Sequence, residues 1–172
     1  MLKKLEEEKN KRQEKIEKYS KTLKDIAVLN YSKSEDFENT LYKILKETAL
    51  ALGVNRAGYW SYEPNQMNST KIYDTKINTL ENTTRFYKKD NPTYFEKIES
   101  KHQVVMSDIR SHSTNNKKND SYIYKHNIFS TLDTPVVIDG EVKGIISFEA
   151  TQKIKNWDNE DINFSRTISD II

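Results

Sequence analysis

The hydrophobic positions near the N-terminus follow the rhythm of a long helix. No glycine or proline occurs before Gly53, and Lys, Glu, Arg and Gln dominate the chain as far as Lys24. Apolar or long-stemmed residues alternate in steps of three and four at Leu2, Leu5, Ile16, Tyr19, Leu23 and Ile26. Lys9 and Arg12 fill the two seam positions between them, which is typical of a coiled coil with a polar middle.

Residues 1–30 are therefore expected to form a helix that joins two copies of the chain as a parallel coiled coil. The alternative is a solvated single helix laced with ion pairs between residues four apart. A single helix this polar is marginal in water, because packing supplies most of a helix's stability. The paired helix is the favoured interpretation.

A second helix and two strands are predicted next. The helix begins at a cap near Ser34, carries its apolar residues at helical spacing from Phe37 to Leu52, and ends at Gly53. Val54 to Tyr62 reads as a strand, with Ala57 and Tyr59 on one side and Gly58, Trp60 and Tyr62 on the other. A turn at Pro64 to Gln66 leads into a weaker strand near Thr70 to Ile77.

The middle of the chain alternates short elements with polar stretches. Pro92 to Ser100 is predicted as a short helix with Tyr94, Phe95 and Ile98 inward, and Val104 to Met106 as a three-residue strand. Ser111 to Asp120 reads as a mobile loop, and Ser121 to His126 as one or two helical turns.

The C-terminal third has the clearest pattern. Thr131 to Ile138 and Glu141 to Glu149 are rich in β-branched residues, and Asp139-Gly140 between them fits a hairpin turn in which both residues need positive φ. Trp157 is predicted to start a helix that is still periodic at Ile172, so we expect the parent protein to continue. The fold class is α+β, an antiparallel sheet of five to six strands flanked by helices.

Composition excludes several classes of function. The 28 Lys and Arg residues nearly balance the 26 acids, which argues against a nucleic-acid partner. No stretch approaches the roughly 20 apolar residues of a membrane span, and residues 1–6 lack the apolar region of a signal peptide. The expected location is the cytoplasm.

The sequence gives little support for a catalytic site or a metal site. The chain has no cysteine, so it forms no disulfide, thiolate nucleophile, cysteine-ligated zinc site or iron–sulfur cluster. The three histidines, His102, His112 and His126, lack metal-ligand spacing, although haem ligation by one of them is a remote alternative. No Ser-His-Asp order, nucleophile elbow or glycine-rich phosphate loop occurs. We expect no enzyme and no required cofactor or metal.

Five segments, in order, resemble one known family. Residues 92–98 (PTYFEKI) and 105–110 (VMSDIR) resemble its "YPaYFeaL" and "i..hDar" segments, and residues 127–136 (NIFSTLDTPV) its "gI.S.ldaPi" turn and strand. Residues 140–149 (GEVKGIISFE) resemble "G.vvGvl..e", and residues 155–161 with Phe164 resemble "R.W..dE..F". Together they resemble a GAF domain over roughly residues 36–172, of the kind that precedes GGDEF diguanylate cyclases and histidine kinases.

The resemblance implies a regulatory domain that binds a small molecule, with cyclic nucleotides prominent among the family's ligands. The family's reductase and bilin-carrying members rely on cysteine, which this chain lacks. Cyclic-nucleotide GAF domains often carry an Asn-Lys…Phe…Asp-Glu pattern, and the matching places here hold Thr151, Gln152, Trp157, Asp161 and Ile162. The lysine–aspartate pair of that pattern is missing, although Gln152 can hydrogen-bond Asp161.

A nucleotide pocket needs an apolar or aromatic wall, partners for the base edge and donors for the phosphate. The candidate ligand-binding residues are Trp60, Asp108, Ile109, Tyr122, Asn127, Ser130, Thr131, Phe148 and Thr151. Asp108 and the backbone N–H of Ile109 suit a base edge. The side chains of Asn127, Ser130 and Thr131 suit a phosphate. Three aromatic residues suit stacking: Trp60, Tyr122 and Phe148.

Each candidate also has a purely structural interpretation. Asp108 is more often a turn cap, and Ser130 and Thr131 often satisfy nearby backbone groups. Trp60 and Phe148 are as readily core residues, and Trp157 is more readily a packing anchor for the last helix.

These features lead to two organisational predictions and a mechanism. Residues 1–30 are expected to be a dimerising helix and residues 31–172 the sensor domain, with the C-terminal helix also joining the homodimer. We expect a cyclic nucleotide, cAMP favoured over cGMP, to close residues 107–131 and to signal through the flanking helices to an output domain outside this sequence. The alternatives are a GAF domain that only dimerises or binds a partner protein, and a haem or gas sensor.

Overall fold

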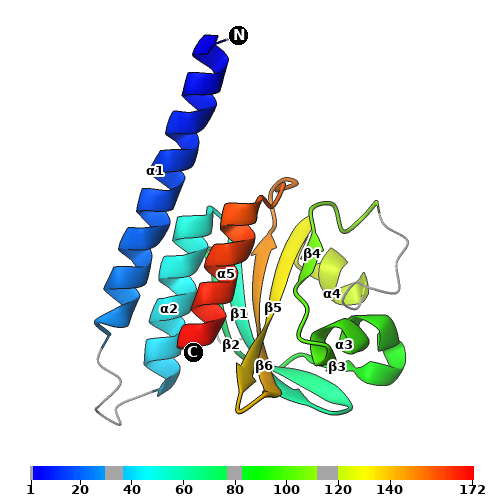
Figure 1. Ribbon diagram of the computed structural model, residues 1–172. Helices are drawn as coiled ribbons and strands as arrows, with labels where there is room; N and C mark the ends of the chain where they lie inside the picture. The colour runs from blue at the N-terminus through cyan, green and yellow to red at the C-terminus, as the bar shows by residue number, and fades with distance from the viewer. Residues whose placement is uncertain (1, 30–36, 77–82, 112–119) are drawn as a thin grey trace.

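The computed structural model describes residues 2–29, 37–76, 83–111 and 120–172, and these form one six-stranded sheet with helices on both faces (Figure 1). The strands are β1 (Arg56–Glu63), β2 (Gln66–Asp74), β3 (Arg85–Tyr87), β4 (Val104–Met106), β5 (Ser130–Ile138) and β6 (Glu141–Ala150). They lie in the order β3-β2-β1-β6-β5-β4, and every neighbouring pair is antiparallel. The predicted α+β class is therefore confirmed.

Two tight hairpins build the centre of the sheet. Asp139 and Gly140 join β5 to β6 with φ of 52° and 79°, which confirms the predicted turn. Pro64 and Asn65 join β1 to β2, because Glu63 pairs directly with Gln66. The pattern did not predict β3, whose three residues pair with the start of β2.

One face of the sheet is covered by α2 (Phe37–Leu52) and α5 (Asn159–Ile171), and we call it the α2/α5 face. The helix α2 ends as predicted at Gly53, whose φ is 68°. The predicted cap at Ser34 lies outside the described residues. The last helix begins two residues later than predicted, because Asp158 is its N-cap and shares a reciprocal capping box with Asp161.

The long first helix, α1 (Leu2–Ala27), packs against α2 and α5, and its N-terminal half extends beyond the sheet (Figure 1). Tyr19 and Ile26 are buried in the core of the α2/α5 face, and Leu23 packs against that core. Leu2 and Leu5 are exposed by 85% and 53%. Thus the C-terminal part of the predicted seam contacts its own chain in this structure, because α2 and α5 offer it an apolar surface.

The opposite face is covered by α3 (Pro92–Glu99) and α4 (Asp120–Lys125), and we call it the α3/α4 face. Tyr94, Phe95 and Ile98 of α3 are buried there, as predicted. Both covering helices are short. The predicted mobile loop between Ser111 and Asp120 falls mostly on residues 112–119, which lie outside the described residues.

Candidate functional site

A row of paired residues crosses the sheet on the α3/α4 face and carries a buried ion-pair network. Asp74 of β2 lies beside Arg56 of β1, which lies beside Glu149 of β6, which in turn lies beside Thr131 of β5. The Arg56 Nε atom is 3.0 Å from Glu149 Oε2, and its Nη1 atom contacts Asp74. Adjacent strands each contribute one residue, so strand register alone brings these charges together.

The network keeps Arg56 charged and a neighbouring phenol protonated. Burial by itself lowers the pKa of a guanidinium, but Glu149, Tyr122 and Asp74 raise the pKa of Arg56 above its ordinary value. The hydroxyl of Tyr122, from α4, lies 3.2 Å from Arg56 Nη2 and accepts from it. Burial first, and Glu149 second, raise the pKa of Tyr122 well above its usual range, so this hydroxyl donates to Glu149.

A second row lies next to the first and adds another buried carboxylate. Asp133 of β5 pairs with Ser147 of β6, and Ser147 pairs with Gly58 of β1. The hydroxyl of Tyr94, from α3, donates to Asp133 Oδ2 over 2.9 Å. Burial and the Asp133 carboxylate raise the pKa of Tyr94 well above its ordinary value. Each of the two covering helices therefore contributes one tyrosine hydroxyl to the polar rows.

An aromatic wall borders these rows. Trp60 of β1 stacks on Phe86 of β3 with ring centroids 5.0 Å apart. Tyr122 meets both rings edge-on, at 5.6 Å from Trp60 and 5.3 Å from Phe86. The structure thus brings two predicted stacking residues together, and the missed strand β3 supplies a third ring.

Phe148 is not part of that wall, which corrects the predicted grouping. It pairs with Ala57 on β1 and with Leu132 on β5, and it is buried in the core of the α2/α5 face. Neighbouring residues on a strand point to opposite faces, so Phe148 and its neighbour Glu149 are separated by the sheet. Phe148 is a core residue here.

Asp108 and Ile109 make local contacts after β4. Asp108 Oδ1 accepts from the backbone N–H groups of Arg110 and Ser111, each over 3.2 Å, as a turn cap does. The N–H of Ile109 donates to the carbonyl of Phe129 over 2.8 Å. These contacts match the structural interpretation of Asp108, and they tie residues 108–111 to the start of β5.

Asn127, Ser130, Thr131 and Thr151 lie close together at the ends of β5 and β6. Asn127 adopts φ of 53°, accepts from Arg110 Nη2 over 2.7 Å, and donates to the carbonyl of Thr151 over 3.1 Å. Ser130 Oγ donates to the Ser107 carbonyl and accepts from the Lys155 N–H over 2.7 Å. Thr131 is buried beside Glu149. Of these predicted residues, only Thr131 belongs to the polar rows.

Asp161 is paired with lysines rather than with Gln152. Its Oδ1 atom lies 2.8 Å from Lys15 Nζ and its Oδ2 atom 3.7 Å from Lys155 Nζ. Gln152 is exposed. The structure therefore pairs Asp161 with two lysines outside the family pattern: Lys15 reaches it from α1, and Lys155 from the loop before α5.

The described residues offer little to a metal ion. They contain no group of three or more His, Cys, Asp or Glu side chains placed to hold one. His102 is exposed, His126 lies beside the Tyr122 ring at 4.6 Å, and His112 is outside the described residues. Within the same residues, no helix is long and apolar enough to cross a membrane.

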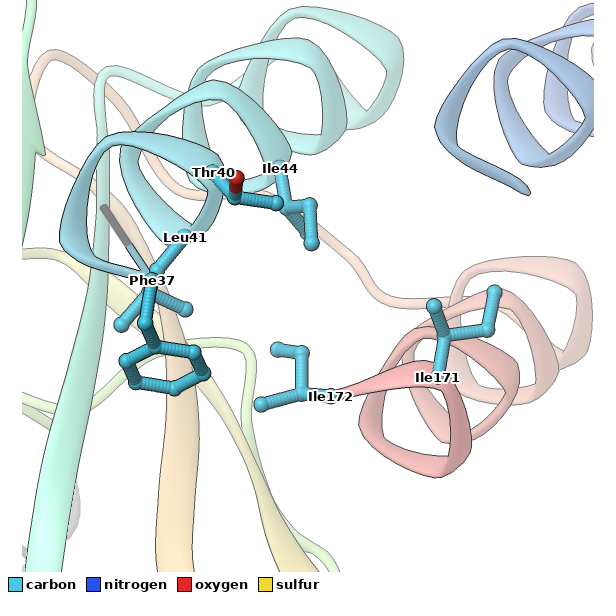
Figure 2. A pocket seen from close by; sticks show the side chains of 6 residues that line it. All are labelled: Phe37, Thr40, Leu41, Ile44, Ile171 and Ile172. Carbon is cyan, nitrogen blue, oxygen red and sulfur yellow. The ribbon is translucent and has the colours of Figure 1, made fainter. Parts of the chain in front are cut away.

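A pocket of about 300 Å³ lies elsewhere, between the start of α2 and the end of α5 (Figure 2). Phe37, Leu41 and Ile44 point from α2 toward Ile171 and Ile172. It is a groove in the helix layer, lined by these side chains and by Thr40, and it lies on the α2/α5 face rather than beside the polar rows. It does not correspond to the predicted space beneath residues 107–131.

Sequence reasoning missed the charged members of the site, Arg56, Asp133 and Glu149. A signal existed for the two carboxylates: Glu149 interrupts an apolar stretch at Phe148-Glu149-Ala150, and Asp133 carries the single charge of residues 130–138. A charge within a buried strand is rare unless it is paired, so such interruptions are candidates for a buried network.

The sheet, its two helix layers and the buried ionic network together form an α+β domain, and the family match places this domain in the regulatory, ligand-binding class. The chain belongs to the GAF domain family, whose model matches residues 36–172. No curated protein sequence matches the chain.

Solved structures show the same fold. The GAF domain of a phosphoenolpyruvate-protein phosphotransferase (ptsP) from Coxiella burnetii is similar with a TM-score of 0.71, 14% identity and 90% coverage of both chains. The A. aeolicus nlh2 GAF domain in an inactive state has a TM-score of 0.65 and 17% identity over 93% of both chains. The free methionine-R-sulfoxide reductase of Neisseria meningitidis, in complex with its substrate, reaches 0.69 at 15% identity over 89% of this chain and 84% of that one.

Proposed function

We propose that this GAF domain is a sensor whose small-molecule ligand binds on the α3/α4 face, over the rows that contain Arg56, Asp133 and Glu149. The observation that carries the proposal is the burial of these charges. Arg56 is 1% exposed, Asp133 1% and Glu149 2%. Buried ion pairs add little stability compared with apolar packing, so their presence beneath two short helices favours a binding role.

The proposed ligand is a cyclic nucleotide, with cAMP as the first candidate and cGMP as the second. Trp60, Phe86 and Tyr122 are buried against one another, so they offer aromatic surface to a base only when a covering helix moves. The buried carboxylates then accept from the amino group of a purine. The phosphate is the demanding part, because Arg56 already contacts both Asp74 and Glu149. Binding a phosphate at Arg56 requires one of these carboxylates to move away.

Calorimetric titration of the protein with cAMP and with cGMP tests this proposal. We expect saturable heat with one of them and a raised melting temperature. Asp133→Asn, which keeps the shape of the side chain but removes its charge, is expected to weaken binding about tenfold or more. Asp139→Asn makes the same chemical change at the exposed hairpin and should bind normally. Absence of heat and of any thermal shift with both nucleotides removes the cyclic-nucleotide proposal.

The second candidate function is assembly, in which the domain joins two copies and needs no ligand. It is supported by Leu2 and Leu5, which remain exposed on the part of α1 that extends beyond the sheet. Replacing both leucines with lysine should convert a dimer to a monomer in analytical ultracentrifugation. A wild-type monomer at all accessible concentrations contradicts this candidate. In either case the proposed output domain, such as a diguanylate cyclase, lies outside this sequence.

A further inference from the structure

Asp161, at the third position of α5, is a fully buried carboxylate that receives contacts from both ends of the chain. It is 0% exposed. From α1, the Tyr19 hydroxyl donates to Oδ1, and Lys15 Nζ lies 2.8 Å from the same atom. From the loop before α5, Lys155 Nζ lies 3.7 Å from Oδ2. We call Tyr19, Lys15, Lys155 and Asp161 the Asp161 cluster.

The surrounding contacts extend this attachment along the first turn of α5. Lys15 also reaches Asp158, and Arg12 reaches Glu160 at 2.6 Å. The Tyr19 ring stacks on Phe164 with centroids 4.1 Å apart. The acids at the start of α5 complement the positive end of its dipole by themselves, and the cations of α1 pair with them only while α1 stays in place.

A second set of hydrogen bonds connects this cluster with the end of β4 and the start of β5. The indole N–H of Trp157 donates to the Met106 carbonyl over 3.3 Å, and its backbone N–H donates to Ser107 Oγ over 3.4 Å. The backbone N–H of Lys155 donates to Ser130 Oγ, which itself donates to the Ser107 carbonyl. The loop that carries Lys155 is thus fixed to the residue that precedes Asp108.

We propose that the Asp161 cluster is a conformational switch that holds α1 on α5. The Ser107 and Ser130 contacts determine the equilibrium between docked and undocked α1. In the docked arrangement the Asp161 carboxylate is satisfied by Tyr19 and Lys15. In the undocked arrangement α1 leaves α5, and Tyr19 and Ile26 become exposed. Movement of residues 107–111 shifts Trp157 and Lys155, which weakens the contacts to Asp161 and favours undocking.

Hydrogen exchange of the intact chain, measured by mass spectrometry without any ligand, tests the switch independently of the proposed function. An undocked α1 is a polar single helix, so its amides lose protection. Tyr19→Phe keeps the stacked ring and removes only the hydroxyl that donates to Asp161. It should make amides 13–27 exchange about tenfold faster, with no matching change in β5 and β6.

The remote variants decide whether residues near β4 control the switch. Ser107→Ala removes only the hydroxyl that accepts from the Trp157 backbone N–H. Ser130→Ala removes the hydroxyl that accepts from the Lys155 N–H and donates to the Ser107 carbonyl. Each should accelerate exchange in amides 13–27 although neither residue touches α1. If Tyr19→Phe leaves that exchange unchanged, the cluster does not hold α1. If both serine variants leave it unchanged, the coupling is absent.

Two control variants separate the switch from general loosening. Tyr94→Phe removes a buried tyrosine-to-aspartate hydrogen bond of the same kind on the opposite face, and Gln13→Ala removes an exposed hydrogen bond to Glu17 within α1 itself. Both should leave the exchange of amides 13–27 within twofold of wild type. Equal acceleration by Tyr94→Phe and Tyr19→Phe would mean that α1 reports only global stability, which overturns the proposal.

Discussion

Arg56 and Glu149 form an ion pair across β1 and β6, with Nε and Oε2 3.0 Å apart and side chains exposed by only 1% and 3%. Strand pairing places them directly opposite each other. Asp74 and Tyr122 also contact the guanidinium. The α3/α4 face therefore combines an apolar cluster with a buried ionic network that spans three strands.

Glu149→Gln should destabilise the fold by about 3 kcal/mol, because breaking a buried pair leaves Arg56 with an uncompensated part of its charge. Urea unfolding followed by circular dichroism measures the change. Glu141→Gln is the matched control, since Glu141 pairs with Lys143 at the exposed hairpin. It should leave the free energy of unfolding unchanged, and equal losses in both variants would contradict the assigned role of the buried pair.

The elements that sequence predicted best are those fixed by neighbouring residues. The Asp139-Gly140 turn and the end of α2 at Gly53 depend on positive φ, and the structure has it at all three positions. The placement of Trp60 and Ala57 on opposite faces of the sheet also followed from simple alternation along β1. These features need no knowledge of which strand pairs with which.

The features that sequence did not predict depend on strand register. Alternation alone cannot say whether Phe148 shares a face with Trp60, because that depends on how β6 is aligned with β1. The actual register pairs Trp60 with Ile145 and Ala57 with Phe148. The same register places Arg56 beside Glu149, and the register of β2 on β1 adds Asp74 to the row. The polar site is thus a product of tertiary pairing.

Gly144→Ala should destabilise the hairpin, because a Cβ atom there meets the Tyr59 ring. The nearest ring carbons would lie 2.6 Å away and the hydroxyl oxygen closer still, which forces the side chain or the strand to move. Overpacking of this kind costs about 1–3 kcal/mol. In a Tyr59→Ala background the ring is gone, and Gly144→Ala should cost almost nothing. A double-mutant cycle from urea unfolding measures the difference, and additive effects would show that the ring is not the obstacle.

Acid should loosen the contact between α1 and α5 through Asp158. Burial raises the pKa of this carboxyl, but the hydrogen bonds from Lys15 and from the Asp161 backbone outweigh it and lower the pKa below 3.8. A lowered folded-state pKa contributes stability above the unfolded value, and this contribution disappears as the pH falls from about 5 through the folded pKa. Asp158→Asn keeps a cap but loses the charge, so its stability should fall less between pH 5 and 3. Identical pH profiles of the two proteins from urea unfolding would contradict this role.

Asn127 joins three segments, and its replacement separates backbone strain from lost hydrogen bonds. It adopts φ of 53°, accepts from Arg110 and donates to Thr151. Asn127→Gly tolerates the φ and loses only the side-chain bonds, which should cost about 1–2 kcal/mol. Asn127→Ala loses the same bonds and adds strain of about 1 kcal/mol, so it should be the less stable variant.

Hydrogen exchange should then show faster opening of residues 108–111 in both Asn127 variants, because Arg110 keeps its bond to the Ile128 carbonyl but loses the one to Asn127. Arg110 would still stack on Phe129, whose ring centroid lies 4.1 Å from the guanidinium carbon, so the segment should loosen rather than detach. If Asn127→Gly matches wild type in both stability and exchange, the side chain of Asn127 does not hold this segment. Only its tolerance of the left-handed conformation would then matter at that position.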